Sequence, residues 1–260
     1  MSIPAMAEVV ECDELGHGHP VLLVHGMVFG PDAFAATARA LSPHARVLVI
    51  HRRGYGRSAS HAAGAQPEDH AADILGLLDR LGIERVSALG VSGGATVLAA
   101  FAMAHPDRCA GIILHEPALG PLAPGVHALY AGLARAVAAA ASPAVGADLL
   151  ASALAGPRTW GSIGTGGRAE ARRWAGAVRQ EMPLHVRFAP TVAELSALRA
   201  VPVVAAVGSR SGSERREAAG VLARHAGAAT ALVPAAGNLA HLDNPLALAA
   251  MMRAQISRLD

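Results

Sequence analysis

The sequence contains no lysine, so all 22 of its basic residues are arginines. Enzymes that form a Schiff base on lysine, or that pair a serine with a lysine base, are therefore excluded. The arginines are scattered along the chain and the formal net charge is only +2, whereas nucleic-acid-binding proteins gather basic residues into a patch or stripe. We therefore expect no nucleic-acid partner, and any catalytic base must be a histidine, a carboxylate or water.

Cysteines and aromatic residues are scarce. The two cysteines, Cys12 and Cys109, lie on separate predicted strands, and neither their number nor their spacing indicates a disulfide framework or a metal site. Both are expected to act as small buried apolar residues. Aromatic residues make up 3% of the chain, so a substrate pocket would be lined mainly by Leu, Val, Met and Ala. We expect no metal and no cofactor.

Long uncharged apolar segments are missing too. No stretch reaches the ~18 to 20 residues that a membrane-spanning helix needs, and residues 1–10 have neither the basic start nor the apolar run of a secretory signal. These absences predict a cytoplasmic protein without a membrane partner. The oligomeric state is left open, with a homodimer as one option.

The chain alternates apolar strands with helical segments. Its 260 residues, 52% of them hydrophobic, are enough for one large domain with an inserted subdomain. The alternation indicates an α/β fold with a parallel sheet, helices on both faces and ligands bound at the carboxyl ends of the strands. Strands are predicted at residues 7–12, 20–24, 46–50, 86–89, 109–114, 201–207 and 230–233. Helices are predicted at residues 31–41, 67–82, 95–103, 214–225 and 245–259.

Between residues 117 and 200 the rhythm changes. Alanine-rich helical segments flank a loose glycine-rich loop at residues 156–167. We interpret this part as a helical cap over the sheet, inserted into a core that consists of residues 1–116 and 201–260.

The most informative stretch is Gly90-Val91-Ser92-Gly93-Gly94, a G-x-S-x-G pattern between a predicted strand and a predicted helix. This is the setting of a nucleophile elbow, in which glycines keep Cβ atoms away from a sharp turn and leave the serine hydroxyl exposed. The pattern alone is weak in a glycine-rich chain, where an idle serine in a turn is the alternative. Its strand and helix flanks make it specific.

Five segments in this order give the chain a resemblance to the α/β-hydrolase fold superfamily, over nearly its whole length except the predicted cap. They are His25-Gly26-Met27, the Arg-Arg-Gly-Tyr-Gly-Arg-Ser segment at 52–58, the elbow, His115-Glu116-Pro117, and residues 237–245. The resemblance implies a mostly parallel eight-stranded sheet flanked by helices, with a helical cap inserted after the sixth strand. It also implies roles for individual residues.

By this resemblance, Ser92 is the nucleophile, and the backbone N–H groups of Met27 and Gly93 form an oxyanion hole for the developing negative charge. Ser92 is then expected to face a pocket that is roofed by residues 117–200.

The resemblance fails at two positions of the catalytic triad. Members of the superfamily usually carry the triad acid in a Gly-x-x-Asp arrangement after the seventh strand, where this chain has Ser211. They usually carry the triad histidine in a Gly-His segment after the eighth strand, where this chain has Asn238. An amide has no basic lone pair near neutral pH, so an ordinary triad is not available. We expect Asn238→His to need Ser211→Asp as well before it yields a good esterase.

Four histidines are candidates for the missing base or for other roles in the pocket. His241 lies three residues beyond Asn238 and is either the base or a buried structural histidine. His51 and His115 end predicted strands on the carboxyl side of the sheet, and His25 follows another; their alternative role is to hold neighbouring groups by hydrogen bonds.

Glu116 is the leading candidate for the missing acid. It follows the predicted sixth strand, a position from which some α/β hydrolases supply this group, and its carboxylate could orient a histidine or act as a base. The alternative is that Glu116 anchors the cap. Glu214, near the missing aspartate, is expected in the solvated first turn of a helix.

Three functions fit these residues. The leading hypothesis is an enzyme that acts through Ser92 on a small apolar carbonyl compound, namely an ester, thioester or lactone. The second is a non-hydrolytic enzyme of the same fold, in which Asn238 positions the substrate: a lyase, cyclase, dehydratase or decarboxylase, for example in natural-product biosynthesis. The third is a non-catalytic ligand-binding protein, because a fold does not fix a function.

Overall fold

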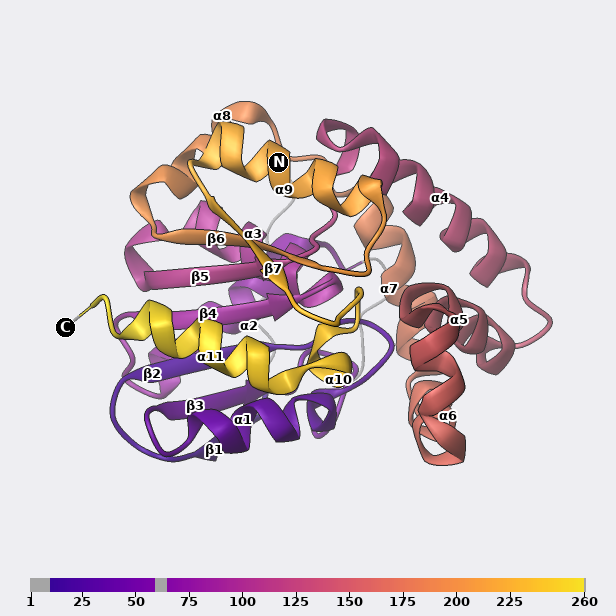
Figure 1. Cartoon of the computed structure of the whole chain (residues 1–260), viewed down its shortest axis with the longest axis horizontal. Coiled ribbons are helices and arrows are strands. Elements are labelled where there is room, and N and C mark those ends of the chain that lie inside the picture. Colours follow the sequence, from indigo (N-terminus) through magenta and orange to yellow (C-terminus); the bar gives the residue numbers. More distant parts are fainter. Residues whose placement is uncertain (1–9, 59–64, 260) are drawn as a thin grey trace.

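The computed structural model describes residues 10–58 and 65–259. Its centre is a sheet of seven strands in the order β1-β3-β2-β4-β5-β6-β7 (Figure 1). β1 pairs with β3 in antiparallel orientation, and every other neighbouring pair is parallel. The strands are β1 (Cys12–Leu15), β2 (Pro20–Val24), β3 (Arg46–Ile50), β4 (Val86–Val91), β5 (Cys109–His115), β6 (Val203–Gly208) and β7 (Ala229–Val233).

The predicted class, a mostly parallel sheet within an α/β fold, is confirmed. The expected count of eight strands is wrong for the described residues, because their N-terminal segment supplies one antiparallel strand, β1, rather than two. β1 also begins at Cys12, whereas the strand predicted at 7–12 lies partly outside the described residues. Of the two cysteines, Cys109 is buried as expected and Cys12 is only partly buried.

Helices cover both faces of the sheet. α1 (Ala35–Leu41) and α11 (Pro245–Ile256) pack together on one face, and α2 (Pro67–Arg80), α3 (Gly93–Ala104) and α9 (Ser213–Ala226) share an apolar core on the other (Figure 1). The inner strands are buried on both sides, as the unbroken apolar run of β2 requires. Short elements complete the core: α10 (Ala240–Asp243) and 3₁₀ turns at Pro31–Phe34, Pro106–Arg108, Gly120–Leu122 and Leu198–Ala200.

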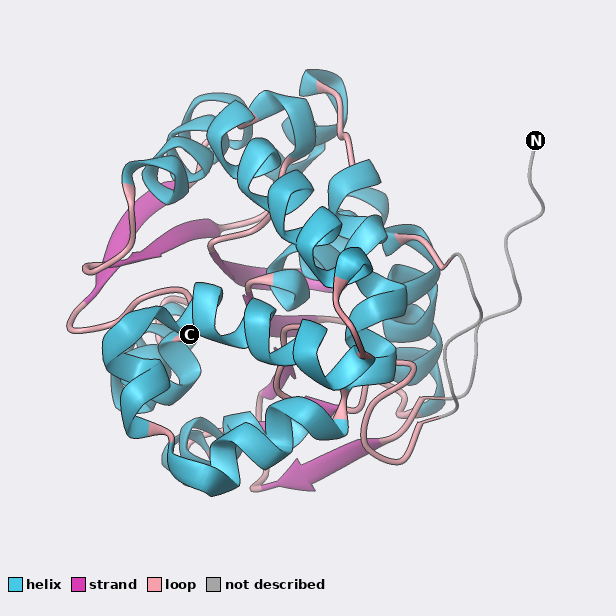
Figure 2. Cartoon of the chain, turned by 90° about the vertical axis from the view of Figure 1, so that its right-hand side faces the viewer, coloured by secondary structure: helices cyan, strands magenta, loops and turns pink. Residues whose placement is uncertain are grey.

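Five helices lie between β5 and β6. Four of them lie beyond the carboxyl ends of the strands (Figure 1). Figure 2 views the molecule from that side, so these helices face the reader. The fifth, α8, packs against α3 and α9 instead. The five are α4 (Pro124–Ala139), α5 (Pro143–Ser162), α6 (Gly164–Arg173), α7 (Ala175–Arg187) and α8 (Val192–Ala197).

The loop predicted at residues 156–167 is wrong, because α5 and α6 run through it. Gly156 has φ 72° and makes only a kink within α5. Pro157 follows, and its fixed φ suits the first turn of the helical segment that resumes there. The glycines therefore redirect the helices rather than end them.

No helix in the described part of the chain is both long enough and apolar enough to cross a membrane.

The start of α11 follows the expected capping pattern. The Asn244 side chain accepts a hydrogen bond of 3.1 Å from the Ala247 N–H and donates one of 2.9 Å to the Pro234 carbonyl. It thereby satisfies a free N–H of the first helical turn and ties the helix to the loop after β7.

We expect Asn244→Ala to lower the free energy of unfolding by about 1 kcal/mol, the usual cost of losing a side-chain cap. Urea denaturation followed by circular dichroism measures this change. Leu246→Ala is the control, because that side chain is 66% exposed and its truncation should cost little. Equal stability of the two variants would contradict the capping role.

Candidate active site

Ser92 occupies a strained turn between β4 and α3. Its φ is 54° and its ψ is −119°, a conformation that residues other than glycine rarely adopt. Flanking glycines make the turn possible: a Cβ on Gly94 would lie 2.1 Å from the Val24 carbonyl oxygen, and one on Gly90 would lie 2.6 Å from the Ala95 Cα. The backbone therefore has the shape that the G-x-S-x-G pattern predicts.

The Ser92 hydroxyl is covered by the cap. Ser92 is 2% exposed, and its Oγ lies 3.1 Å from the Tyr130 Oη of α4. A cavity of about 390 Å³ opens between α4, α5 and the loops after β6 and β7, lined by Ser211, Arg215 and Asn238 among others but not by Ser92. Ser92 does not line this cavity, and its hydroxyl contacts that of Tyr130 instead. That Ser92 faces a substrate pocket stays a prediction.

The loop after β2 lies against the elbow. A Cβ on Gly26 would be 3.2 Å from the Val91 carbonyl oxygen and 3.8 Å from the Gly93 nitrogen. The Met27 side chain approaches Gly93 as well, to 3.2 Å from the position of its missing Cβ. The Gly93 N–H begins α3, where the first N–H groups have no acceptor within the helix. The structure therefore brings Met27 and Gly93 together.

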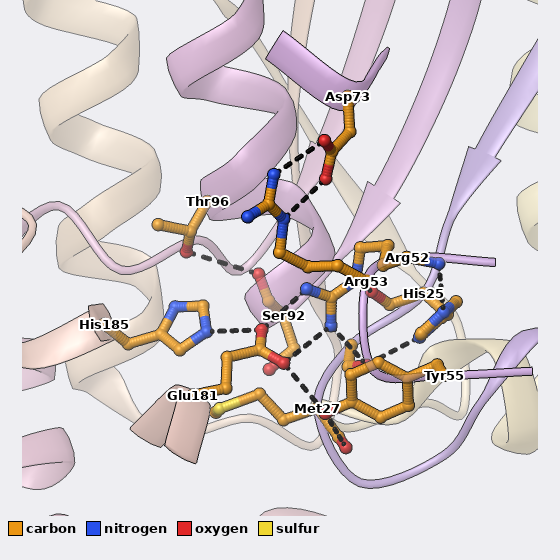
Figure 3. Close-up of polar contacts among 11 residues, drawn as sticks. His25, Met27, Arg52, Arg53, Tyr55, Asp73, Ser92, Thr96, Glu181 and His185 are labelled. Carbon is orange, nitrogen blue, oxygen red and sulfur yellow. Dashed lines mark hydrogen bonds and ion pairs between the residues drawn. The ribbon is translucent and has the colours of Figure 1, made fainter. Parts of the chain in front are cut away.

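Two side chains from the segment after β3 hold the carbonyl groups of this loop (Figure 3). Arg52 donates to the carbonyls of His25 and Gly26 over 2.8 and 2.9 Å, and the Tyr55 hydroxyl donates to that of Met27 over 2.7 Å. Because the carbonyl groups are fixed, the peptide N–H groups of the same loop are fixed as well.

Glu181 on α7 ties this arrangement to the cap (Figure 3). Its carboxylate accepts two hydrogen bonds from Arg52, of 2.7 and 3.1 Å, and lies 2.8 Å from the Tyr55 hydroxyl oxygen, whose single proton it shares with the Met27 carbonyl. Burial alone would raise the pKa of Glu181, but Arg52 and a 3.0 Å hydrogen bond from the His185 Nε2 hold the pKa well below its usual range. Sequence reasoning missed Glu181, and only Arg52 and Tyr55 lay in a recognised motif.

Glu116 is the centre of a second polar cluster, directly after β5. Its Oε1 accepts hydrogen bonds from the Gly208 N–H, over 2.9 Å, and from the Ser211 hydroxyl. Its Oε2 accepts one of 2.9 Å from the Asn238 Nδ2 and lies 3.6 Å from the Arg215 Nε. Glu116 itself has φ 54°. The structure therefore brings Glu116, Ser211 and Asn238 together. Sequence reasoning had proposed Glu116 as the acid and had found Ser211 and Asn238 at the usual positions of the triad acid and histidine.

The pKa of Glu116 lies below its ordinary value. Burial alone would raise this pKa, but the neighbouring His115 and Arg215 and the hydrogen bonds from Ser211 and Asn238 together lower it. Since Asn238 uses its nitrogen on Glu116, its Oδ1 is left buried without a hydrogen-bond partner among the described residues. The Asn238 side chain thus presents an unused acceptor.

His241 and His115 are buried and neutral. The His241 ring packs against Phe29 and Phe34, with ring centroids 6.5 and 5.3 Å away, and burial lowers its pKa to about 3. Burial also lowers the pKa of His115, whose Nε2 lies 3.8 Å from the Glu116 Oε1. Neither ring has a hydrogen-bond partner in the part of the chain that the structure describes. For His241 these contacts favour the structural alternative.

His25 and His51 hold loops. The His25 Nδ1 donates to the Gly26 carbonyl over 2.8 Å, and its Nε2 accepts from the Arg52 N–H over 3.4 Å. The His51 Nε2 donates to Asp13 over 3.0 Å, and its Nδ1 accepts from the Arg57 N–H over 3.0 Å. Both rings therefore have the hydrogen-bonding role that was the alternative for them.

Three further side chains gather around Ser92, and sequence reasoning missed all of them. Tyr130 is fully buried, with the Arg215 Nη1 3.5 Å from its hydroxyl oxygen and the guanidinium carbon 5.2 Å from its ring centroid. The His185 ring packs 5.9 Å from the Tyr130 ring, and a Cβ on Gly93 would lie 3.0 Å from it. Tyr130 and His185 lie in helices whose sequence carries no motif.

Within residues 10–58 and 65–259 no group of three His, Cys, Asp or Glu side chains could hold a metal ion.

The lowered pKa of Glu116 gives a prediction for stability. A carboxyl group whose pKa is lower in the folded than in the unfolded protein stabilises the fold above the unfolded value, about 4.3 for glutamate, and loses this effect as the pH falls through the folded value. Glu116→Gln should therefore be less stable than the parent near pH 7, and the difference should shrink in acid.

Urea denaturation between pH 3 and 7 measures this difference. Glu84→Gln is the matched control, because Glu84 is exposed and should give a small difference that does not change with pH. A constant difference for Glu116→Gln across the range would contradict the assignment of a stabilised carboxylate.

Several known proteins share this architecture. Residues 19–184 match the family model described as alpha/beta hydrolase fold. A solved esterase of Thermogutta terrifontis is 25% identical with a TM-score of 0.80, covering 96% of this chain and 93% of the esterase. The enol-lactonase of Burkholderia xenovorans is 21% identical with a TM-score of 0.77, covering 95% of this chain and 96% of the lactonase.

Curated relatives match over shorter segments. Epoxide hydrolase B of Mycobacterium tuberculosis is 34% identical over 102 residues, which are 37% of this chain and 28% of that protein. A 2-hydroxy-6-oxo-2,4-heptadienoate hydrolase of Pseudomonas putida is 34% identical over 105 residues, 39% of this chain and 38% of that protein. The chain thus spans well under half the length of these relatives. Since the family model covers most of the sheet, the elbow and most of the cap helices, the chain belongs to the α/β-hydrolase fold family.

Proposed function

We propose that the protein is a hydrolase that cleaves an ester, a thioester or a lactone through an acyl intermediate on Ser92. The observation that carries this proposal is the positive φ of Ser92, 54°, at the start of α3. Such strain persists only where the surrounding structure enforces it, and it concentrates at active sites. A reactive serine at a helix N-terminus has the positive end of the helix dipole beside it.

The oxyanion hole in this proposal consists of the N–H groups of Gly93 and Met27. Its support is the approach of the Met27 loop to the elbow and the hydrogen bonds by which Arg52 and Tyr55 fix the carbonyls of that loop. Donors that are fixed before the reaction stabilise a developing oxyanion without reorganisation.

In this proposal, Glu116 and Asn238 occupy the places of the acid and the base of a usual triad, and Asn238 binds rather than acts as a base. The Glu116 carboxylate accepts from Asn238 as it would from a histidine. The Asn238 Oδ1, buried and unpaired, is the acceptor for a donor group of the substrate or for the attacking water. A buried acceptor without a partner costs roughly 1–3 kcal/mol, and a bound molecule would remove this cost.

The proposed substrate is a small carbonyl compound with an apolar body. The cavity beside Asn238 has about 390 Å³, at the lower end of the range for small-molecule sites, and Leu129 and Leu154 contribute to its lining. The esterase and the enol-lactonase of this fold, by their names, act on carbonyl compounds.

A second candidate is a non-hydrolytic reaction at the same site. The observation that favours it is the amide of Asn238 where a base would stand, with its oxygen unpaired. In that case the oxyanion donors would stabilise an enolate or alkoxide, and Asn238 would position the substrate.

Covalent labelling separates the two candidates. A fluorophosphonate labels a serine only when its surroundings raise its nucleophilicity. We expect the protein to be labelled and to hydrolyse a short aryl ester, and we expect Ser92→Ala to lose both, with a fall in rate of at least ~10³-fold. Mass spectrometry of the labelled peptide and the rate of ester hydrolysis measure this. No labelling of a folded protein over hours would favour the non-hydrolytic reaction.

The hydrogen bond between Glu116 and Asn238 changes the expectation for Asn238→His. An imidazole at this position would find the Glu116 carboxylate where Asn238 Nδ2 now donates, over 2.9 Å. We therefore expect Asn238→His alone to raise the rate of ester hydrolysis by about 10²-fold, the lower end of what a positioned base contributes.

The expected benefit of adding Ser211→Asp to Asn238→His is reversed as well. Ser211 donates to Glu116, so Ser211→Asp would place two carboxylates side by side, and their repulsion would force one of them to take up a proton. The double variant should therefore be slower than Asn238→His. Glu116→Gln in the Asn238→His background is the control and should remove the gain. A double variant faster than Asn238→His would contradict the role of Glu116 as the acid.

A further inference from the structure

The Ser92 hydroxyl has a specific partner. Among the described residues, its Oγ makes its hydrogen bond with the Tyr130 Oη, 3.1 Å away. Tyr130 has no exposed surface and Ser92 is 2% exposed, so the contact is shielded from solvent. A group that exchanges a proton with a nucleophile must lie within hydrogen-bond reach of it, and Tyr130 meets this condition.

The histidines meet this condition less well. His241 packs against phenylalanine rings. Both ring nitrogens of His25 are hydrogen-bonded to backbone groups of residues 26 and 52. His185 lies closest to the elbow, but its Nε2 donates to Glu181 and its Nδ1 has no hydrogen-bond partner in the described part of the chain. None of these three rings is hydrogen bonded to Ser92.

Arg215 supplies the charge that a phenolate needs. Its Nη1 lies 3.5 Å from the Tyr130 Oη, and because a guanidinium can only donate, the phenolic oxygen is the acceptor. Burial alone would lower the pKa of Arg215, but Tyr130 and Glu116 together raise it, so the guanidinium stays charged. A fixed positive charge beside the phenolic oxygen stabilises the anion that remains when the proton has left.

We propose that Tyr130 is the catalytic residue that takes the proton of Ser92, in the place of the missing histidine. This inference rests on the proposed hydrolysis of an ester, thioester or lactone. The Tyr130 phenolate, held by Arg215, is the reactive form.

In the first step, the phenolate oxygen takes the hydrogen of Ser92 Oγ while Oγ forms a bond to the carbonyl carbon. The π electron pair of the carbonyl moves to its oxygen, which becomes the oxyanion. When this intermediate collapses, the bond from the carbon to the leaving oxygen or sulfur breaks, and the Tyr130 hydroxyl gives that atom its proton. Water then attacks the acyl-enzyme: it loses one proton to Tyr130 while its oxygen forms a bond to the acyl carbon. When this second intermediate collapses, the bond from the carbon to Ser92 Oγ breaks, Oγ takes the proton back from Tyr130, and the acid is released.

Tyr130→Phe tests the proposal, because it removes one oxygen and keeps the ring. We expect kcat/KM for a short aryl ester to fall by about 10²- to 10⁴-fold, the usual contribution of a general base. The rate of the parent should rise with pH through the alkaline range, and the rate of the variant should not. Ser152→Ala removes an exposed hydroxyl from α5 and serves as the control, with an unchanged rate and profile.

Site-specific 3-fluorotyrosine at position 130 gives the same test without loss of the hydroxyl. Fluorine makes the phenol more acidic, so the alkaline rise should move to lower pH, a shift that a purely structural tyrosine would not cause. This variant also decides the question if Tyr130→Phe proves to be unfolded. An unmoved profile, or a Tyr130→Phe variant that is folded and at least as fast as the parent, would overturn the inference.

Ser92→Ala distinguishes the failure of the inference from the failure of the function. If the parent hydrolyses the ester and Ser92→Ala does not, while folded Tyr130→Phe keeps the full rate, only the role of Tyr130 is overturned. If the parent is inactive, or if Ser92→Ala is as active as the parent, the hydrolytic function is overturned and the inference with it.

Discussion

The buried ion pair between Arg52 and Glu181 connects the two layers of this molecule. Both side chains are almost fully buried, at 2.7 and 3.1 Å from each other, and the remaining hydrogen-bonding groups of Arg52 hold the carbonyls of the loop after β2. Two charges out of water are tolerated only when their geometry and their other hydrogen bonds are good. The position of α7 over the sheet and the shape of the loop beside the elbow therefore depend on the same contact.

A second chain of charges runs through the site on the other side of Ser92. Glu116 binds Asn238 and Ser211, lies beside Arg215, and Arg215 in turn reaches the Tyr130 hydroxyl that touches Ser92. Glu116 and Arg215 help to keep each other charged, because burial would otherwise favour the neutral form of each. An acidic group thus lies near the serine, with a guanidinium and a phenol between them.

Much of the core was predictable from the sequence because its signals are local. Buried parallel strands read as short apolar runs, which is why β2 and β3 match their predicted bounds. The elbow combines glycines, a strand and a helix within residues 86–104, and the same locality made Asn244 recognisable as a cap. Glu116 could be nominated because it directly follows a strand. The sheet edge was harder to predict, since β1 joins it by antiparallel pairing with β3.

The remainder of the site is made by contacts between residues distant in sequence. Tyr130 and Ser92 are 38 positions apart, and Arg52 and Glu181 are 129 apart. The cap helices contain no recognised motif, so nothing in their sequence marks Tyr130, Glu181 or His185. By itself the sequence determined the mostly parallel sheet and the strained serine turn, because these follow from local backbone and side-chain chemistry. Only the tertiary structure decided what touches Ser92, because that depends on how α4 and α7 pack over the carboxyl ends of the strands.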